Sequence, residues 1–343
     1  MVTRAAVLEA PRRLGLRTRP RPVPGPGEVV VRVAATAICH TDLEIYTGRH
    51  PGVRYPVVMG HEATGVVDAI GPDVARVAVG QRVVINPIIA CGACDCCARG
   101  QENLCRRAGL MGRELDGSLV EHARLPARFV HALPAHLELG VATLIETLAT
   151  VRHAQQRVGI GPDDAVVVLG QGTTGLLHTQ LAKLTGARLV IALSRSPWKL
   201  DLARRMKADH TVGTAGPAAV AEVLRLTGGQ GADVVIDSAG DPDLLGPALE
   251  MLRPGGRLLA YAISHAPVPG FTTFPLYYKE LTLYGARALM PGDLDEAIGL
   301  VASGTIEVAD FITASYPLDQ VAVAFEDYAR DPGRILRLLV VQA

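Results

Sequence analysis

The segment AVVVLGQGTTG, residues 165–175, constrains the fold of this chain more than any other, because it joins an apolar run to three closely spaced glycines. Five apolar residues ahead of a turn predict a short strand that is buried on both faces. The glycines follow the spacing G-x-G-x-x-G and a helical pattern comes next, which is the context of a dinucleotide-binding unit. The chain is therefore expected to contain a parallel sheet covered by helices.

The alternation of strands and helices continues beyond this segment. Apolar runs such as RLVIAL, DVVIDSAG and GRLLAYA are separated by stretches with helical spacing, expected at about 173–185, 197–206 and 242–252. Such alternation predicts a doubly wound parallel sheet, and hence an α/β fold. Residues 28–84 differ, because short β-rich runs there are interrupted by Gly and Pro. That pattern predicts a largely β region.

Two domains are expected from the length of the chain as well, since its 343 residues exceed a usual single core of about 150 residues. The tail carries further β-like runs, ELTLYG and ILRLLVV, which we assign to the β-rich domain. The predicted domains are a β-rich domain formed by 1–148 with 283–343, and a dinucleotide-binding domain formed by 149–282.

Each glycine of the motif has a physical role in holding a pyrophosphate. Gly170 permits the tight turn, Gly172 lets the backbone approach the phosphates, and Gly175 allows the helix to pack closely. The helix starts at Thr173 and Thr174, and its N-terminus attracts negative charge. A turn that merely needs glycine would explain a bare match, but the strand before it and the helix after it favour a cofactor site.

The cofactor type is indicated by the end of the next apolar run, RLVIAL, where NAD-binding units carry a carboxylate for the ribose hydroxyls. This chain has Ser194 and Arg195 there, with Lys199 close behind. A carboxylate repels a 2′-phosphate, whereas a hydroxyl and a guanidinium bind it through charge-assisted hydrogen bonds. NADP(H) is therefore expected in preference to NAD(H), the alternative being that Arg195 is a solvated surface charge.

Five of the six cysteines crowd into residues 91–105, which favours metal binding over disulfides in a reducing compartment. The spacing C-x2-C-x2-C-x7-C supplies four thiolates, from Cys91, Cys94, Cys97 and Cys105. Four thiolates can enclose a tetrahedral zinc ion and leave no position for substrate. We therefore expect a structural zinc site whose ligands contribute to folding, with Cys96 as the spare thiol.

A second group of zinc-type donors lies nearer the N-terminus. Cys39 and His61 supply a thiolate and an imidazole from separate β segments, and a zinc site with fewer than four protein ligands can hold substrate. The stretch GHEATGVVDAIGPDV matches the signature G-H-E-x2-G-x5-G-x2-V. With the four-Cys loop and the glycine motif in the expected order, the chain resembles the zinc-containing medium-chain dehydrogenase/reductase family, within the alcohol dehydrogenase superfamily, over almost its whole length.

This resemblance implies a GroES-like catalytic domain beside a Rossmann domain, and a catalytic zinc ion held by Cys39 and His61. The third ligand in the family is a Cys or, in polyol and threonine dehydrogenases, a Glu. Glu146 in LIETLATVRHA is similar to the L-I-E-P pattern of that second group, although Thr147 replaces the Pro. Glu62 is the competing or exchanging ligand. An ordinary helix carboxylate is the alternative for Glu146.

The resemblance also implies roles for the residues around these ligands. Asp42 orients His61 through the second ring nitrogen. Thr41 accepts the proton of the substrate hydroxyl on its way to the cofactor ribose, and His40 approaches the pyrophosphate. Glu44 stands where many members have a His that ends the proton relay to solvent. Either Glu44 takes the proton itself or a water route bypasses it, and the sequence leaves both routes open.

The function that follows is hydride transfer between NADP(H) and a small secondary alcohol, polyol, cyclitol or sugar, in a cleft between the domains. Zinc stabilises the alkoxide and nicotinamide accepts its hydride. Two zinc ions per chain are expected, and the resemblance implies homodimers or homotetramers. Two alternatives stay open: a zinc-free quinone or enoyl reductase of the same fold, and a non-enzymatic zinc and dinucleotide sensor.

Composition argues against other kinds of partner. With 34 basic and 34 acidic residues, the chain lacks the net positive charge that favours nucleic acid. No apolar run approaches the roughly 18 residues of a membrane span, and the start MVTRAAVLEAPRR lacks the apolar segment of a signal peptide. A cytoplasmic enzyme without a membrane or nucleic-acid partner is therefore expected.

Overall fold

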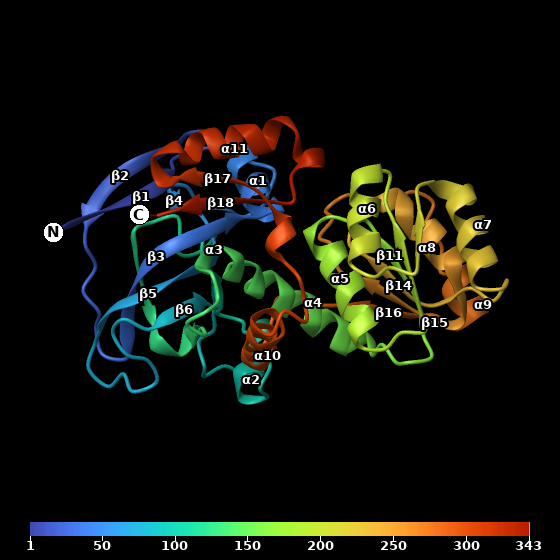
Figure 1. Ribbon diagram of the computed structural model, residues 1–343, viewed down its shortest axis with the longest axis horizontal. Helices are drawn as coiled ribbons and strands as arrows, with labels where there is room; N and C mark the ends of the chain where they lie inside the picture. Colours follow the sequence, from blue (N-terminus) through green and yellow to red (C-terminus); the bar gives the residue numbers. More distant parts are fainter. Residues whose placement is uncertain (343) are drawn as a thin grey trace. The chain divides into compact units, whose positions relative to one another are not determined.

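The computed structural model describes residues 1–342, and over these residues the chain divides into two compact units (Figure 1). The first unit contains Met1–Ala149 together with the chain from Leu289 onward, and the second contains Thr150–Ala288. The first boundary lies inside helix α4 (Leu144–Val158), so one helix contributes residues to both units.

The second unit is built on a parallel sheet with the strand order β13-β12-β11-β14-β15-β16. Its strands are β11 (Ala165–Leu169), β12 (Leu189–Leu193), β13 (His210–Val212), β14 (Ala232–Asp237), β15 (Leu252–Ala260) and β16 (Thr282–Gly285). Its helices, besides the end of α4, are α5 (Thr173–Leu184), α6 (Pro197–Arg205), α7 (Gly216–Leu226), α8 (Leu245–Met251) and α9 (Phe274–Lys279).

Alternate residues of these strands enter separate cores on the two faces of the sheet. Val167 packs in one cluster with Val223 of α7 and Ala248 of α8. Its neighbour Val166 packs in another cluster with Ala182 of α5. Because both faces are covered by helices, the central strand β11 is apolar throughout, as the run AVVVL predicted. The predicted doubly wound parallel sheet is confirmed.

Strand β16 corrects one assignment made from the sequence. The run ELTLYG was assigned to the β-rich domain, with the domain boundary at residue 283. β16 instead pairs in parallel with β15, with Leu283 opposite Leu258, and the first unit resumes at Leu289. A β-rich run indicates that a strand forms, but it carries no information on which sheet supplies the partner strand. The order of the sheet decides this, and local sequence does not encode that order.

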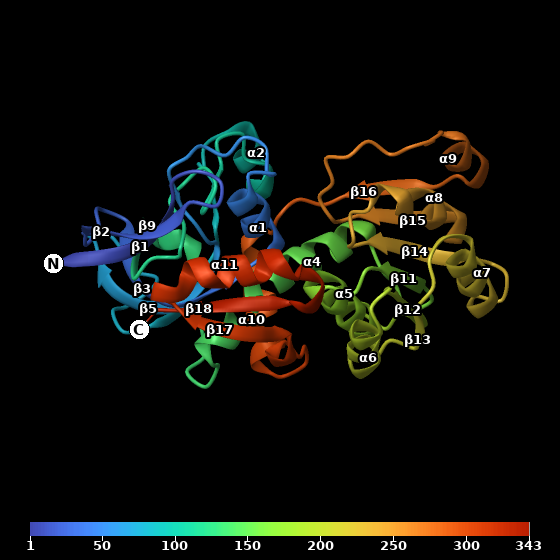
Figure 2. The ribbon, with the colours of Figure 1, turned by 90° about the horizontal axis from the view of Figure 1, so that it is seen from above.

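The first unit is largely β, as predicted, with a sheet of order β10-β6-β5-β3-β18-β17 and β9 also paired to β3. Its strands are β1 (Val2–Leu8), β2 (Leu14–Pro20), β3 (Glu28–Ile38), β4 (Val57–Val58), β5 (Glu62–Ile70), β6 (Arg82–Ile85), β7 (Ile88–Ile89), β8 (Gly109–Leu110), β9 (His122–Pro126), β10 (Val130–Ala132), β17 (Ile312–Pro317) and β18 (Arg337–Val341). Its helices, besides the start of α4, are α1 (His40–Thr47), α2 (Asp95–Ala98), α3 (Leu139–Ala142), α10 (Pro291–Ala302) and α11 (Val321–Arg330). Helix α11 packs along β17 and β18 (Figure 2).

The register of this sheet brings two loops of the first unit together. Strands β3 and β5 are antiparallel, and Ala37 lies opposite Glu62. The chain leaves β3 at Cys39 and enters β5 from His61, so these two residues come from adjacent strand ends. Strand β18 pairs with the other side of β3 and starts at Arg337, which therefore reaches the same end of the sheet. Within residues 1–342, no helix is both long and apolar enough to cross a membrane.

Candidate metal centres and nucleotide site

Cys39 and His61 face each other across the ends of β3 and β5. The Cys39 Sγ atom lies 3.1 Å from His61 Nε2, and both side chains are buried. The ligand atoms of Cys39, Asp42 and His61 all lie within 4.8 Å of one another. A thiolate and an imidazole are the donors that zinc prefers, so this donor set fits a zinc ion. Such a pair leaves coordination positions for a further ligand and a substrate.

Asp42 holds the imidazole from its other side. Its Oδ1 atom lies 3.3 Å from His61 Nδ1, and its Oδ2 atom accepts a hydrogen bond of 3.0 Å from the Cys39 backbone N–H. Burial alone lowers the pKa of His61, but the Asp42 carboxylate and the Cys39 sulfur together outweigh burial and hold that pKa well above its usual value. With Nδ1 turned to the carboxylate, Nε2 is the nitrogen available to a metal.

Glu62 is held by an arginine that the sequence did not single out. Arg337 donates from Nε and Nη2 to the two carboxylate oxygens of Glu62, at 2.9 and 2.8 Å, and from Nη2 to Thr147 Oγ1 at 3.2 Å. Both charged side chains are almost fully buried. A charged residue inside the apolar run ILRLLVV was the available signal, because Arg is almost never buried without a partner.

Glu146 is buried in the first turn of α4, next to Thr147. Burial, followed by the negative charge of Glu62, raises the pKa of the Glu146 carboxyl to about 7. The structure places Glu146 near the charges of His61 and Arg337, but outside the group formed by Cys39, Asp42 and His61. Its role as third ligand stays a prediction.

Helix α1 carries Thr41 and Glu44 of the predicted proton relay, and also His40, which is predicted to approach the pyrophosphate. His40 and Thr41 open the helix, and His40 Nε2 lies 3.9 Å from Glu44 Oε1 one turn later. His40 is exposed, whereas Thr41 and Glu44 are partly buried. Residues four apart share one helix face, so His40 and Glu44 line the same side of α1. Their predicted roles stay predictions.

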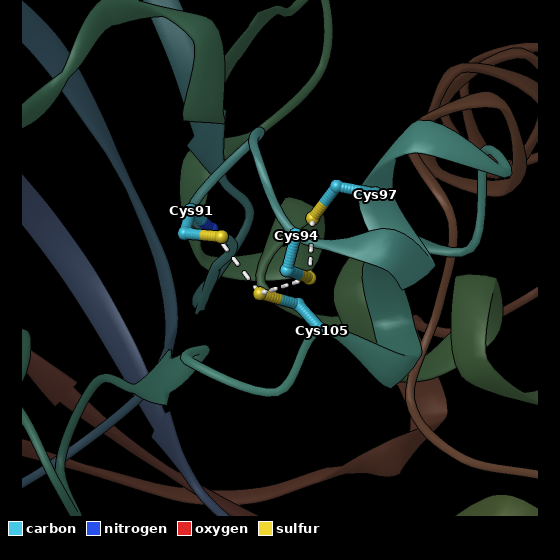
Figure 3. A group of neighbouring side chains, drawn as sticks. All are labelled: Cys91, Cys94, Cys97 and Cys105. Carbon is cyan, nitrogen blue, oxygen red and sulfur yellow. Dashed lines mark hydrogen bonds between the residues drawn. The ribbon is translucent and has the colours of Figure 1, made fainter.

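The four cysteines of the loop 91–105 converge on one point (Figure 3). The sulfur of Cys94 lies 3.5 Å from that of Cys97 and 3.7 Å from that of Cys105. Backbone N–H groups donate to these sulfurs, and such a donation from Cys97 is the main reason why the pKa of the Cys94 thiol falls to about 6. The cluster therefore fits a tetrahedral site of four thiolates, with every position taken by protein.

Cys96 lies outside that cluster. It is buried on the short helix α2, and its sulfur contacts Arg99 Nη2 at 3.7 Å. The four sulfurs that lie within 4.8 Å of one another are those of Cys91, Cys94, Cys97 and Cys105. The placement of Cys96 agrees with its assignment as the spare thiol.

The three glycines of the nucleotide motif meet different surroundings. A Cβ atom on Gly175 would lie 2.0 Å from the Gly170 carbonyl oxygen, so close packing of α5 against the turn requires glycine there. Gly170 has φ +85°, a conformation that favours glycine. A Cβ atom on Gly172 would meet no protein atom within 4 Å among the described residues. The space at Gly172, beside the start of α5 at Thr173 and Thr174, is open to a phosphate group.

The predicted 2′-phosphate residues lie on the connection from β12 to α6. Ser194 directly follows β12, and its Oγ atom accepts a hydrogen bond of 3.2 Å from the Ser196 backbone N–H. Arg195 is exposed. The Lys199 ammonium lies 5.3 Å from the centre of the Trp198 ring, in the first turn of α6. The three predicted residues thus share one short segment beside the glycine turn.

Comparison with known proteins identifies relatives over the whole chain. Residues 25–135 match the alcohol dehydrogenase GroES-like domain, and residues 173–303 match the zinc-binding dehydrogenase domain. Sorbitol dehydrogenase of Bacillus subtilis (strain 168) is 30% identical over 342 residues, which cover 98% of this chain and 96% of that protein.

Two solved structures carry a nicotinamide cofactor. A zinc-binding dehydrogenase of Sinorhizobium meliloti 1021 bound to NADP is 30% identical, with a TM-score of 0.87 and 99% of each chain covered. An alcohol dehydrogenase of Escherichia coli CFT073 complexed with NADH is 28% identical, with a TM-score of 0.92 and 99% of each chain covered. Both forms of the cofactor therefore occur among proteins of this fold.

Proposed function

The chain belongs to the zinc-containing medium-chain alcohol dehydrogenase family, in its polyol and sugar dehydrogenase branch, and from this premise we propose that it transfers hydride between NADP(H) and a polyol, cyclitol, sugar or similar secondary alcohol. The observation that carries the proposal is the buried contact of Cys39 Sγ with His61 Nε2 at 3.1 Å, backed by Asp42. These side chains form a reaction centre rather than a binding surface.

In this proposal Cys39, His61 and Glu146 hold a catalytic zinc ion. When bound there, zinc supplies Lewis acidity that eases the loss of a proton from a substrate hydroxyl. Asp42 keeps the imidazole oriented, because its carboxylate lies against Nδ1. Thr41 Oγ1 receives the proton of the substrate hydroxyl, and Glu44 is the residue of α1 through which the proton reaches solvent. The nicotinamide ring supplies the hydride acceptor.

The proposal for Glu146 rests on charge and burial. Arg337 compensates the charge of Glu62 through two hydrogen bonds, whereas Glu146 is buried within electrostatic reach of that pair and of His61. A buried carboxylate needs a cation or strong donors to stay ionised. A zinc ion on the imidazole side would provide the cation. Glu62, bound by Arg337, acts as a ligand only when it leaves the guanidinium.

A test of this ligand set uses Glu146→Gln, which keeps the shape of the side chain and removes its charge. We expect loss of the catalytic zinc ion, measured as metal per chain, with the four-cysteine ion retained as an internal reference. Cobalt substitution gives a second readout, because its absorption spectrum responds to a change of ligand. An unchanged metal content together with an unchanged cobalt spectrum would exclude Glu146 from the ligand set.

We propose that a second, structural zinc ion is bound by Cys91, Cys94, Cys97 and Cys105, which gives two ions per chain.

NADP(H) preference is proposed from the hydroxyl of Ser194 and the charges of Arg195 and Lys199, none of which repels a 2′-phosphate. His40, exposed on α1, is proposed to contact the pyrophosphate. Assembly into homodimers or homotetramers is a further proposal, tested by the mass of the protein in solution.

The function as a whole is tested with a panel of polyols, sugars and ketones, assayed with both cofactors. Turnover with at least one polyol, lost on removal of zinc and restored by adding it, is the expected result. A zinc-free reductase of the same fold would instead keep its activity after chelation. A sensor would bind zinc and dinucleotide with no turnover across the panel.

A further inference from the structure

Four neighbouring strands of the second unit end in register at one edge of the sheet. Leu169, the last residue of β11, lies opposite Leu193 of β12 on one side and Asp237 of β14 on the other, and Asp237 lies opposite Ala260 of β15. The residues that follow these strand ends, in order across the edge, are Ser194, Gly170, Ser238 and Tyr261. Tyr261 therefore lies two strand spacings, about 10 Å, from Gly170, on the side opposite Ser194.

This order divides the edge between the two halves of a dinucleotide. A pyrophosphate at Gly170–Gly175 lies in the middle, and the adenosine ribose lies at the strand end marked by Ser194. The second nucleoside of the cofactor must then extend in the other direction, past Ser238 towards Tyr261. Ligands of open parallel sheets bind at the carboxyl ends of the strands, which is where Tyr261 is located.

The ring of Tyr261 is fixed in one orientation. Its hydroxyl lies 2.7 Å from Thr150 Oγ1 of α4, and its ring meets the His178 ring edge-on, with 4.6 Å between centroids and 86° between planes. His178 is fully buried and is held in turn by Gln155, whose Nε2 atom donates to Nδ1 at 3.1 Å. Tyr261 itself is partly exposed. An oriented, partly exposed aromatic side chain, packed against the core that Val166 and Ala182 enter, thus stands at this end of the edge.

We infer that Tyr261 is the residue on which the nicotinamide ring of the cofactor docks, and that Thr150 and His178 position the Tyr261 ring for this contact. Aromatic rings attract one another in offset-stacked and edge-to-face arrangements, beyond the effect of the area that they bury. A pre-oriented ring also loses little conformational entropy when the ligand binds. This inference rests on the proposed dinucleotide-binding function, and it adds a residue for the nicotinamide half.

The test compares two ligands that differ only in the nicotinamide. NADPH carries the ring, and 2′-phospho-ADP-ribose carries everything else. In Tyr261→Ala we expect the dissociation constant for NADPH, measured by titration calorimetry, to rise about tenfold, the equivalent of about 1.4 kcal/mol. The dissociation constant for 2′-phospho-ADP-ribose is expected to stay unchanged. A rise that is equal for both ligands, or absent for both, would overturn the inference, because a merely structural tyrosine does not distinguish them.

Two further variants keep the test decisive. Tyr261→Phe retains the ring and frees it from Thr150, so we expect a smaller rise than in Tyr261→Ala, again confined to NADPH; this variant carries the test if the alanine variant does not fold. Tyr316→Phe is the matched control, because the Tyr316 hydroxyl is likewise hydrogen-bonded, as a donor to Asp327, but lies in the first unit. If the unaltered protein binds neither ligand, the proposed function fails, which is a result distinct from failure of the inference.

Discussion

Arg337 on β18 and Glu62 on β5 form a buried ion pair with two hydrogen bonds, at 2.9 and 2.8 Å, although 275 residues separate them in the sequence. Strand β3 lies between their two strands in the sheet and pairs with both. The pair therefore joins the first segment of the unit to the segment that returns near the end of the chain. The pair also fixes the carboxylate of Glu62, which is the residue directly after the proposed ligand His61.

Removing the arginine should destabilise the first unit strongly. Arg337→Leu leaves the Glu62 carboxylate buried without its partner, and such a change costs about 3–5 kcal/mol. Urea denaturation followed by circular dichroism measures the loss. In the double variant Arg337→Leu, Glu62→Leu we expect much of the stability to return, because no uncompensated charge is left. Arg334→Leu is the control: its pair with Asp331 is exposed, so its cost should stay below about 1 kcal/mol.

The four-cysteine site should lose its metal when one sulfur is removed. Cys94→Ser is expected to lower the zinc content by about one ion per chain and to lower the melting temperature, because all ligands of a closed structural site take part in folding. Metal analysis and thermal unfolding measure both effects. Cys96→Ser, which alters the neighbouring thiol outside the cluster, should keep the full zinc content. Equal metal loss in the two variants would contradict the assigned ligands.

Cofactor choice should follow the segment after β12. The double variant Ser194→Asp, Arg195→Ala places a carboxylate where a 2′-phosphate is proposed to bind and removes a cation. We expect the ratio of kcat/KM for NADP⁺ to that for NAD⁺ to fall about tenfold to hundredfold, which corresponds to one or two charge-assisted hydrogen bonds. Arg204→Ala, near the far end of α6, should leave the ratio unchanged. A ratio that the double variant does not move would refute the NADP assignment.

Sequence patterns predicted those features of the fold that depend on neighbouring residues. The strand Ala165–Leu169 and the helix beginning at Thr173 form where the apolar run and the glycine spacing indicated. The helix expected at 197–206 spans Pro197–Arg205, with proline at its first position. The donors Cys39 and His61 also come together as expected.

Features that depend on distant strands were not predictable in the same way. Strand order decides which residue pairs with Arg337 and which sheet contains Thr282–Gly285. The residues next to these positions in the sequence do not indicate that order. The contact of Thr150 with Tyr261 is of the same kind, since 111 residues separate them. The polar and β-forming residues in these long-range contacts are of types common throughout the chain, so their identity does not indicate a partner. The one sequence signal is an arginine within an apolar run, which indicates a buried charge that needs a partner.

The buried imidazole of His178 should make the second unit less stable in acid. Burial lowers the pKa of His178 to about 3, whereas a histidine in the unfolded chain has a pKa near 6.5. Between these values the unfolded chain binds a proton that the folded unit does not, so the stability is complete above about pH 6.5 and is lost as the pH falls. The loss approaches about 1.4 kcal/mol per pH unit, or about 2 kcal/mol at pH 5.

The measurement uses Trp198, which is the one tryptophan of the chain and belongs to the second unit. Its fluorescence follows urea unfolding of that unit at pH values from 7 to 5. His178→Gln cannot bind a proton at this position, so its free energy of unfolding should fall less steeply with decreasing pH than that of the unaltered protein. His136→Gln, which replaces an exposed histidine in the first unit, should keep the original pH dependence. Parallel pH profiles for the unaltered protein and His178→Gln would show that another group causes the acid sensitivity.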